Sequence, residues 1–176
     1  MTTYLFYVAF TSFVVVMLIM GLFFITSMWL NNSFKARVDR KTRDYRELIH
    51  MHFSNPSNVS DEDIGHVKKL ISSKAGLLGF YKVYKEYLDT YGFYEEIRSY
   101  NNQVIEFKML IKNKIVRSKY RKSYILFLMS EFRLNTKEVI EYALDALDSD
   151  SIYVRYNALK LIRNSGNTSA FLDALE

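Results

Sequence analysis

Hydrophobic residues run almost without interruption from residue 4 to residue 30, and no charged side chain precedes Lys35. An α-helix needs about 20 predominantly apolar residues to cross the hydrocarbon core of a bilayer. This run is longer than that, it exceeds the apolar core of a signal peptide, and it lacks a small-residue cleavage site. The pattern therefore predicts an uncleaved transmembrane helix over residues 4–30.

Basic and aromatic residues flank the apolar run and indicate its orientation. Basic residues lie only on its C-terminal side, in a first basic run made of Lys35, Arg37, Arg40, Lys41, Arg43 and Arg46. Because Lys and Arg are enriched on the cytoplasmic side of spanning helices, we expect a single-pass inner (plasma) membrane protein with its N-terminus outside. Aromatic residues near both ends suit the interfacial belts, namely Tyr4, Tyr7, Trp29 and Phe34.

Beyond the apolar run, hydrophobic residues recur at the three- and four-residue spacing of helices. A basic juxtamembrane helix is expected to continue to Phe53 and to end at residues 54–58, because Pro56 and its neighbours favour a turn. We assign this helix and linker to residues 31–60. The first basic run is explained by topology and by attraction to anionic lipid, worth about 1 kcal/mol per basic group.

The next segment predicts several short helices. Ser60 and the three acids after it are typical of a helix start. The expected helices cover residues 61–71, 77–91 with Gly92 as its stop, 93–100 and 104–115. No repeat aligns here, so we treat residues 61–115 as an irregular helical segment.

A more regular pattern follows over residues 116–176. A helix expected over 119–132 precedes one capped by Thr136, then an Asp-rich turn and a second apolar helix that ends before Gly166. A weaker copy lies 34 residues upstream, within the range of helical repeat periods. In that copy Tyr120-Arg121 stands where Val154-Arg155 does, and Phe132 stands where Gly166 does.

This pattern resembles a HEAT repeat, in which an aliphatic helix, an Asp-rich turn and a second helix are followed by glycine. The residues that carry the resemblance are Asp148, Asp150, Val154, Arg155, Ala158, Leu159 and Gly166. The resemblance implies a short cytoplasmic α-solenoid of HEAT-like hairpins, in which the aspartates cap the second helix and bond Arg155. Phe171, Leu172 and Leu175 would open another unit, so we expect either a truncated chain or another surface covering them.

The whole layout, with Gly92-Phe93-Tyr94 before the repeats, is similar to bacterial single-pass proteins with a cytoplasmic HEAT array. Members of that group are found alongside membrane glycosyltransferases of exopolysaccharide systems. The similarity implies that the partner is an integral membrane protein of that kind.

Composition agrees with an all-α fold. The sequence contains one proline and little strand-like alternation, and its 14 Tyr and 13 Phe can build a helical core. Because there is no cysteine, a disulfide framework and a thiolate metal site are excluded, which fits a reducing cytoplasm.

A second basic run covers residues 108–122 and contains no acid. Its members are Lys108, Lys112, Lys114, Arg117, Lys119, Arg121 and Lys122. This run could face the membrane or an acidic partner, it could simply be solvated, or with Tyr120 and Tyr124 it could bind nucleic acid. Nucleic acid is the least favoured of these.

Candidate chemistry is sparse. His50 and His52 lie two apart on a helix and point in different directions, while Glu62 and His66 alone provide too few ligands for a metal site. A solvated helix face explains these residues better. Asp145, Asp148 and Asp150 have no histidine partner, and no Gly-rich phosphate loop or nucleophile motif occurs.

We therefore predict no cofactor, no metal and no enzymatic activity. The favoured function is a membrane-tethered scaffold whose helical repeats bind a partner protein. The alternatives are a membrane-tethered nucleic-acid binder that uses residues 108–122 and, last, an enzyme of unrecognised type.

Overall fold

Helix α1 (Thr2–Ser54) contains the whole apolar run and continues through both basic and amphipathic sequence. The computed structural model describes residues 2–112 and 120–174, and in these ranges all regular secondary structure is helical. The side chains of residues 4–30 are exposed, and among the described residues α1 is the helix long and apolar enough to cross a membrane. The predicted continuation of the helix to Phe53 is confirmed.

The chain forms two compact units that meet in sequence between Arg40 and Lys41. In the second unit the last turns of α1 are amphipathic and bury Tyr45, Ile49 and Phe53. The predicted break follows, with a short 3-10 helix, η1, over Pro56–Asn58. The same helix therefore has an exposed apolar part and a part that belongs to a protein core.

Helices α2 (Asp61–Ile71) and α3 (Lys74–Tyr91) have the caps that their sequences predict. The Ser60 hydroxyl accepts a hydrogen bond from the Asp63 amide at 3.1 Å, and Gly92, with φ of +79°, ends α3. The helix predicted from residue 77 begins earlier because the Ser73 hydroxyl caps it, accepting from the Gly76 amide at 3.0 Å.

The predicted division between the next two helices is wrong. Helix α4 covers Glu95–Val104 and α5 covers Phe107–Lys112, so the break falls after Val104 rather than after Tyr100. Helix α4 continues through Asn101 because this residue is fully buried and its amide donates to the Phe132 carbonyl at 2.9 Å. Residues 113–115 of the predicted helix lie outside the described residues.

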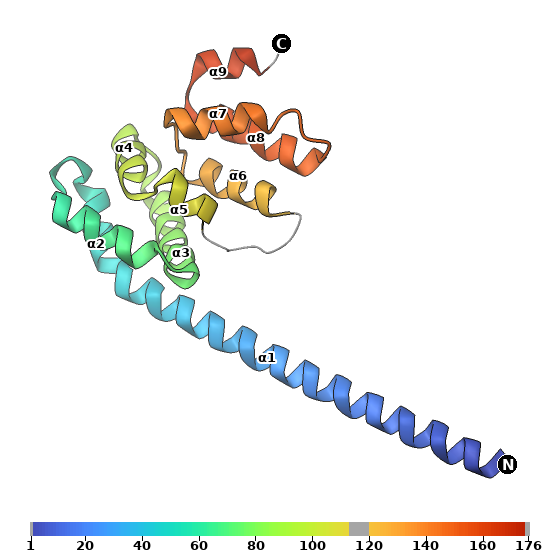
Figure 1. Cartoon of the computed structure of the whole chain (residues 1–176). Coiled ribbons are helices and arrows are strands. Elements are labelled where there is room, and N and C mark those ends of the chain that lie inside the picture. Colours follow the sequence, from blue (N-terminus) through green and yellow to red (C-terminus); the bar gives the residue numbers. More distant parts are fainter. Residues whose placement is uncertain (1, 113–119, 175–176) are drawn as a thin grey trace. The chain divides into compact units, whose positions relative to one another are not determined.

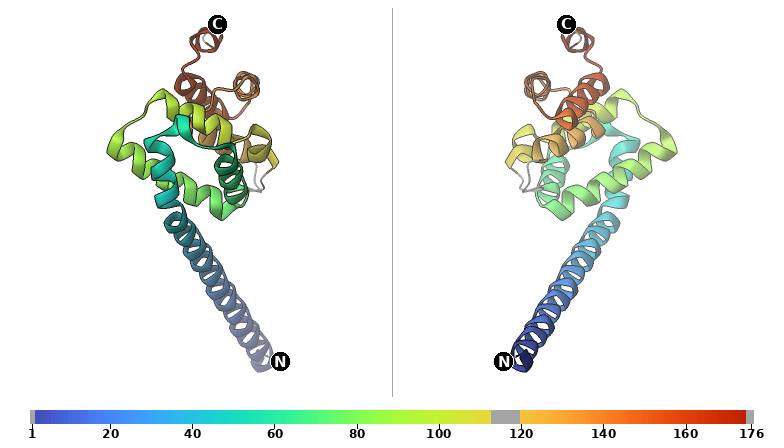
Figure 2. Two further views of the ribbon diagram at one scale, coloured as in Figure 1. Left: turned by 90° about the vertical axis from the view of Figure 1, so that its left-hand side faces the viewer. Right: turned by 90° about the vertical axis from the view of Figure 1, so that its right-hand side faces the viewer.

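The remaining helices are α6 (Arg121–Glu131), α7 (Lys137–Asp145), α8 (Ile152–Ser165) and α9 (Thr168–Asp173) (Figure 1). Helices α6 and α8 pack on each other, as two further views allow the reader to follow (Figure 2). The Asn157 amide donates to the Ser123 hydroxyl at 2.8 Å, and the Asn164 amide donates to the Ser130 hydroxyl at 3.0 Å. Both pairs are 34 residues apart, so the two helices run in the same direction.

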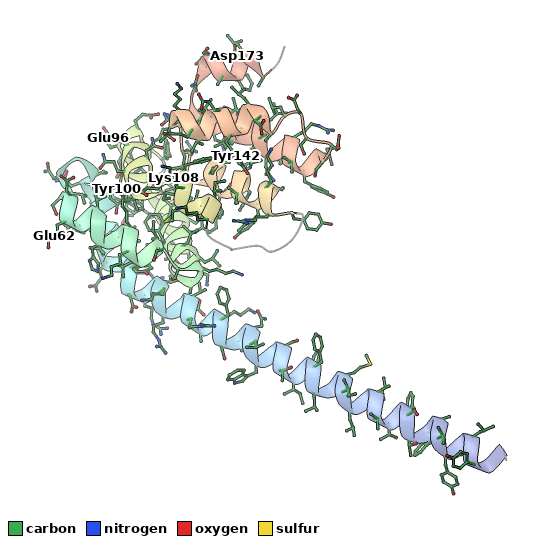
Figure 3. The ribbon with its side chains drawn as sticks, viewed as in Figure 1. Glu62, Glu96, Tyr100, Lys108, Tyr142 and Asp173 are labelled. Carbon is green, nitrogen blue, oxygen red and sulfur yellow. The ribbon has the colours of Figure 1, made fainter. Side chains whose placement is uncertain are left out.

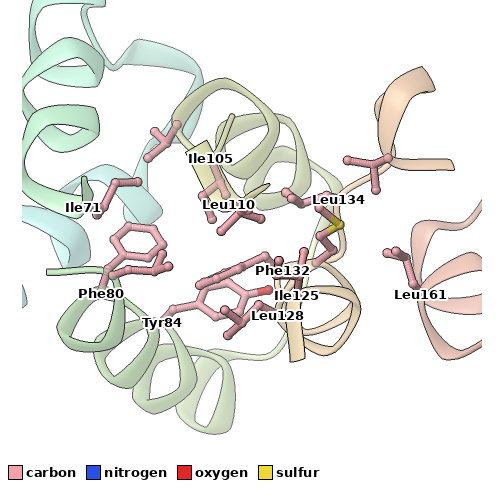
Figure 4. Close-up of a cluster of buried hydrophobic side chains, with 14 of the residues drawn as sticks. Ile71, Phe80, Tyr84, Ile105, Leu110, Ile125, Leu128, Phe132, Leu134 and Leu161 are labelled. Atoms are coloured by element: carbon pink, nitrogen blue, oxygen red, sulfur yellow. The ribbon is translucent and has the colours of Figure 1, made fainter. Parts of the chain in front are cut away.

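Aliphatic side chains and aromatic rings together fill the core of the second unit (Figure 4). Phe132 lies with its ring centroid 5.7 Å from that of Phe80 and 5.3 Å from that of Tyr84. Phe53 meets Tyr84 and Tyr100 edge-on at 5.9 and 5.4 Å. The expected aromatic helical core is confirmed, and it joins α1, α3, α4 and the end of α6.

The start of α8 differs from the arrangement that the HEAT resemblance implies. Ser151 occupies the cap position without a side-chain hydrogen bond, while Asp148 and Asp150 are exposed. Arg155 donates to the backbone carbonyl of Ser149 at 2.6 Å and not to an aspartate. The turn places the Ser149 carbonyl beside the Arg155 guanidinium, so this carbonyl takes the place of the expected aspartate as hydrogen-bond acceptor.

Candidate functional site

The predicted membrane-belt residues lie on α1. Tyr4, Tyr7 and Trp29 are exposed. Phe34 is half-buried, and the Arg37 guanidinium lies 5.9 Å from the centroid of its ring. Each ring is therefore carried by the one helix that could span a bilayer among the described residues.

The first basic run is largely exposed. Lys35, Arg37, Arg40 and Arg43 are open to solvent, and Lys41 is half-buried with an ion pair to Asp44 at 3.7 Å. Arg46 forms an ion pair with Glu86 of α3 at 2.9 Å. Most of this run is free to meet negative charge outside the protein.

The second basic run is not one uniform face. Lys108 and Lys112 are exposed, whereas Arg121 donates to the Ile111 carbonyl, and Lys122 pairs with Asp145 at 3.1 Å. Lys122 also lies over the ring of Tyr142, the residue labelled in Figure 3, and that ring packs edge-on against Phe107. Lys114, Arg117 and Lys119 lie outside the described residues. Two of the four described cations thus connect helices of the protein itself.

Glu131, at the end of α6, is the centre of a polar cluster that the sequence did not reveal. Its carboxylate accepts from Lys160 of α8 at 2.8 Å and from the Tyr81 hydroxyl of α3 at 2.9 Å, and Lys85 lies 3.4 Å away. The Glu131 side chain is only 14% exposed. The cluster joins three helices that lie far apart in the sequence.

Electrostatics keep Glu131 ionised. Burial is the largest influence on the pKa of its carboxyl and opposes ionisation. Hydrogen bonds from Lys160 and Tyr81, with the charges of both lysines, outweigh burial and hold the pKa below its usual range. Glu106 is similar, because a hydrogen bond and ion pair with Lys68 at 2.9 Å lower the pKa of its carboxyl.

His52 corrects the interpretation of the histidine pair as a solvated face. Its side chain is buried, and Nδ1 lies 2.8 Å from the hydroxyl of Tyr100 (labelled in Figure 3). Burial lowers the pKa of the imidazole, and the charge of Asp63 opposes that shift. The stability that the neutral ring contributes is present above pH 6.5, the ordinary pKa, and is lost as pH falls through the folded pKa.

Metal-binding residue types do not converge in the described structure. Within residues 2–112 and 120–174, no group of three or more histidine, aspartate or glutamate side chains is placed to hold a metal ion. A shallow pocket of about 260 Å³ lies beside α5 and contains Glu106 and Glu138. Glu106 is held ionised there, which suits an ion pair better than a general acid near neutral pH.

Exposed apolar side chains gather on α8 and α9. Ile152, Tyr156, Leu159 and Arg163 follow one another at helical spacing and are exposed; we call these four residues the α8 stripe. A groove of about 250 Å³ lies at its C-terminal end, between the stripe and Phe171 of α9. Val154 and Ala158 are buried, but Leu159, which the repeat pattern assigns to the structural set, is 38% exposed.

Comparisons with protein-family models, with curated proteins and with solved structures found no match for this chain.

Proposed function

We propose that this protein is a membrane-tethered, non-catalytic scaffold that holds a partner protein at the inner surface of the plasma membrane. The observation that carries the proposal is the apolar part of α1, where residues 4–30 are uncharged and exposed. Such a surface is unfavourable in water and favourable in lipid. The first basic run supports an orientation with the second unit in the cytoplasm.

The second unit is, in this proposal, a short α-solenoid of HEAT-like hairpins. The parallel packing of α6 and α8, with polar pairs 34 residues apart, supports this because 34 lies in the range of helical repeat periods. Helix α3 lies parallel to α6 in the same way, because Tyr81 contacts Phe127 and Lys85, four residues on, contacts Glu131, also four residues on. Helical stacks present extended surfaces suited to binding proteins.

A scaffold role also suits the electrostatics. Among the described residues, the two carboxylates whose pKa values are shifted, Glu106 and Glu131, are held ionised by lysines rather than prepared to donate protons. The exposed cations Lys108 and Lys112 favour an acidic partner surface or anionic lipid. The similarity in layout points to an integral membrane partner, such as a membrane glycosyltransferase.

Topology is tested by cysteine labelling, because the chain has no cysteine of its own. Single Thr3→Cys and Asn58→Cys variants are treated in intact cells with a maleimide that does not cross membranes. We expect labelling at position 3 only, with position 58 labelled after the cells are lysed. Labelling at 58 in intact cells would overturn the orientation, and extraction of the protein without detergent would overturn the tether.

Partner binding is tested by crosslinking the full-length protein in native membranes, purifying it and identifying the attached proteins by mass spectrometry. We expect one dominant integral membrane protein, whose yield falls when Lys108 and Lys112 are both changed to Glu. Lys137→Glu is the matched control, because Lys137 is an exposed lysine outside the second basic run. Recovery of nucleic acid without a stoichiometric protein would replace the scaffold by the nucleic-acid alternative.

A further inference from the structure

Helices α6 and α8 can be compared position by position at their 34-residue spacing. On α6, Ile125 is 3% exposed and Met129 is fully buried. The corresponding positions on α8 are Leu159, which is 38% exposed, and Arg163, which is open to solvent. The side that neighbouring helices cover on α6 is therefore uncovered on α8.

The α8 stripe ends in a cation, while two acids lie just before its other end, in the turn whose Ser149 carbonyl is bonded by Arg155. Its members are spaced at i, i+4, i+7 and i+11, which places them along one side of the helix. The exposed acids Asp148 and Asp150 lie just before Ile152, at one end, and the exposed Arg163 closes the other. Tyr156 and Leu159 lie between these charged ends.

We propose that the α8 stripe docks against the α8 stripe of a second copy of this chain, with the two helices antiparallel. A two-fold axis presents the same patch on both copies, so the patch must be complementary to itself. Antiparallel pairing about a point between Tyr156 and Leu159 sets Tyr156 of each copy beside Leu159 of the other. It also sets each Arg163 toward Asp148 and Asp150 of the other copy.

The dimensions of the helix permit this pairing. At 1.5 Å per residue within α8, Arg163 and Ile152 each lie about 8 Å from the midpoint of the stripe, on opposite sides of it. Antiparallel pairing therefore sets each Arg163 beside Ile152 of the other copy, next to the turn that carries Asp148 and Asp150. Parallel pairing would instead set Arg163 beside Arg163, so the charge pattern selects the antiparallel dimer.

The groove beside Phe171 gives the second copy a place to pack. It lies at the Arg163 end of the stripe and is lined largely by apolar atoms of Tyr156, Leu159 and Phe171. In the antiparallel dimer this groove receives Ile152 and Tyr156 of the second copy. Each copy thereby covers the apolar surface that the other exposes, independently of the scaffold role proposed above.

The inference is tested by disulfide trapping of the full-length protein in nanodiscs. Chains carrying Tyr156→Cys are mixed with chains carrying Leu159→Cys and oxidised, and we expect a disulfide-linked dimer of the two variants. Tyr91→Cys is the matched control, because Tyr91 is 63% exposed and Tyr156 is 64% exposed, but Tyr91 lies on α3. Equal crosslinking through Tyr91→Cys would show random collision and overturn the proposal.

A charge exchange gives a second, independent test. We expect Arg163→Asp or Asp150→Arg alone to weaken dimerisation about tenfold or more, because like charges then meet across the interface. The double variant R163D/D150R should recover the wild-type dimer, and circular dichroism checks that every variant is folded. A monomeric wild-type chain, or a different protein trapped at position 156 in place of a second copy, would overturn the proposal.

Discussion

Helices α6 and α8 lie side by side and exchange polar contacts at a 34-residue spacing, yet they meet different surroundings. Both carry apolar residues on the side that contains Ile125 and Met129 in α6 and Leu159 in α8. That side is buried on α6 and exposed on α8. The sequence of a helix thus determines which side is suited to burial, while the neighbouring helices determine whether burial occurs.

The two helices also end differently. Helix α8 ends at Gly166, whose φ of +73° is typical of a glycine cap. The corresponding position of α6 is Phe132. There the residue with a positive φ is the next one, Arg133, whose φ is 53°. The Arg133 guanidinium lies 3.9 Å from the ring centroid of Phe93. This shift frees Phe132 to enter the aromatic core against Phe80 and Tyr84.

Matched truncations on the two helices should give the largest difference. Met129→Ala leaves a cavity in the core and should lower the free energy of unfolding by about 2–5 kcal/mol. Arg163→Ala, at the corresponding exposed position of α8, should change it by less than about 0.5 kcal/mol. Thermal or denaturant unfolding followed by circular dichroism measures both. Similar losses from the two variants would contradict the contrast in burial.

Glu131 distinguishes α6 from α8 by charge, since α8 has Ser165 at the corresponding position. Glu131→Gln should lower the free energy of unfolding by about 1–3 kcal/mol, because Lys160 loses its ionised partner in a half-buried site. Glu138→Gln is the control, because Glu138 is exposed. An unfolding midpoint equal to that of the control would show that the cluster contributes little.

The same carboxylate makes a pH-dependent contribution. Because the pKa of Glu131 is lowered in the folded protein, its stabilisation is present above the unfolded pKa and is lost as pH falls through the folded pKa. Unfolding curves of wild type and Glu131→Gln should therefore converge in acid. His52 titrates in both proteins, so its effect cancels in the difference.

The helix ends provide a smaller effect. Gly166→Ala forces a side chain into the left-handed region and should cost about 1–2 kcal/mol. The added Cβ would also lie 2.8 Å from Nη1 of Arg98, which must then move. Gly65→Ala should have the opposite effect, because Gly65 lies within α2 with open space around it. Equal responses to both substitutions would contradict the role of Gly166 as a cap.

The contacts between α6 and α8 should give the smallest effect. Asn157→Ala removes the hydrogen bond to Ser123 and should cost about 1 kcal/mol. Tyr153→Ala, an exposed position on the same helix, is the control. The expected result is a measurable loss for Asn157→Ala alone, measured by chemical denaturation.

Local signals explain which parts of this structure could be predicted. Ser60, Gly92 and Gly166 mark helix ends by their own chemistry, so the start of α2 and the ends of α3 and α8 agree with the sequence. The break after Val104 could not be predicted, because it depends on Asn101 reaching Phe132 from another helix. Helix boundaries that depend on a residue and its neighbours in the sequence can be predicted, and helix boundaries that depend on residues far away in the sequence cannot.

The candidate surfaces follow the same rule. Most of the first basic run is exposed, as expected for charged residues on a helix. In the second basic run, however, Arg121 and Lys122 make contacts within the protein. Glu131 was missed and His52 was wrongly interpreted as solvated, because their partners, Tyr81, Lys160 and Tyr100, lie on other helices. The packing of α6 on α8 had one signal in the sequence: Ser123 and Ser130 on α6 have the same seven-residue spacing as Asn157 and Asn164 on α8.

Lys160 belongs to two places at once, since it lines the groove on α8 and donates to Glu131 on α6. An occupant of the groove that drew the ammonium away from Glu131 would raise the affinity of that carboxylate for a proton, because the hydrogen bond from Lys160 lowers its pKa. Occupancy of the groove and protonation of Glu131 would then be linked equilibria. In that event, assembly at α8 would be coupled to proton uptake and to the contact of α6 with α3.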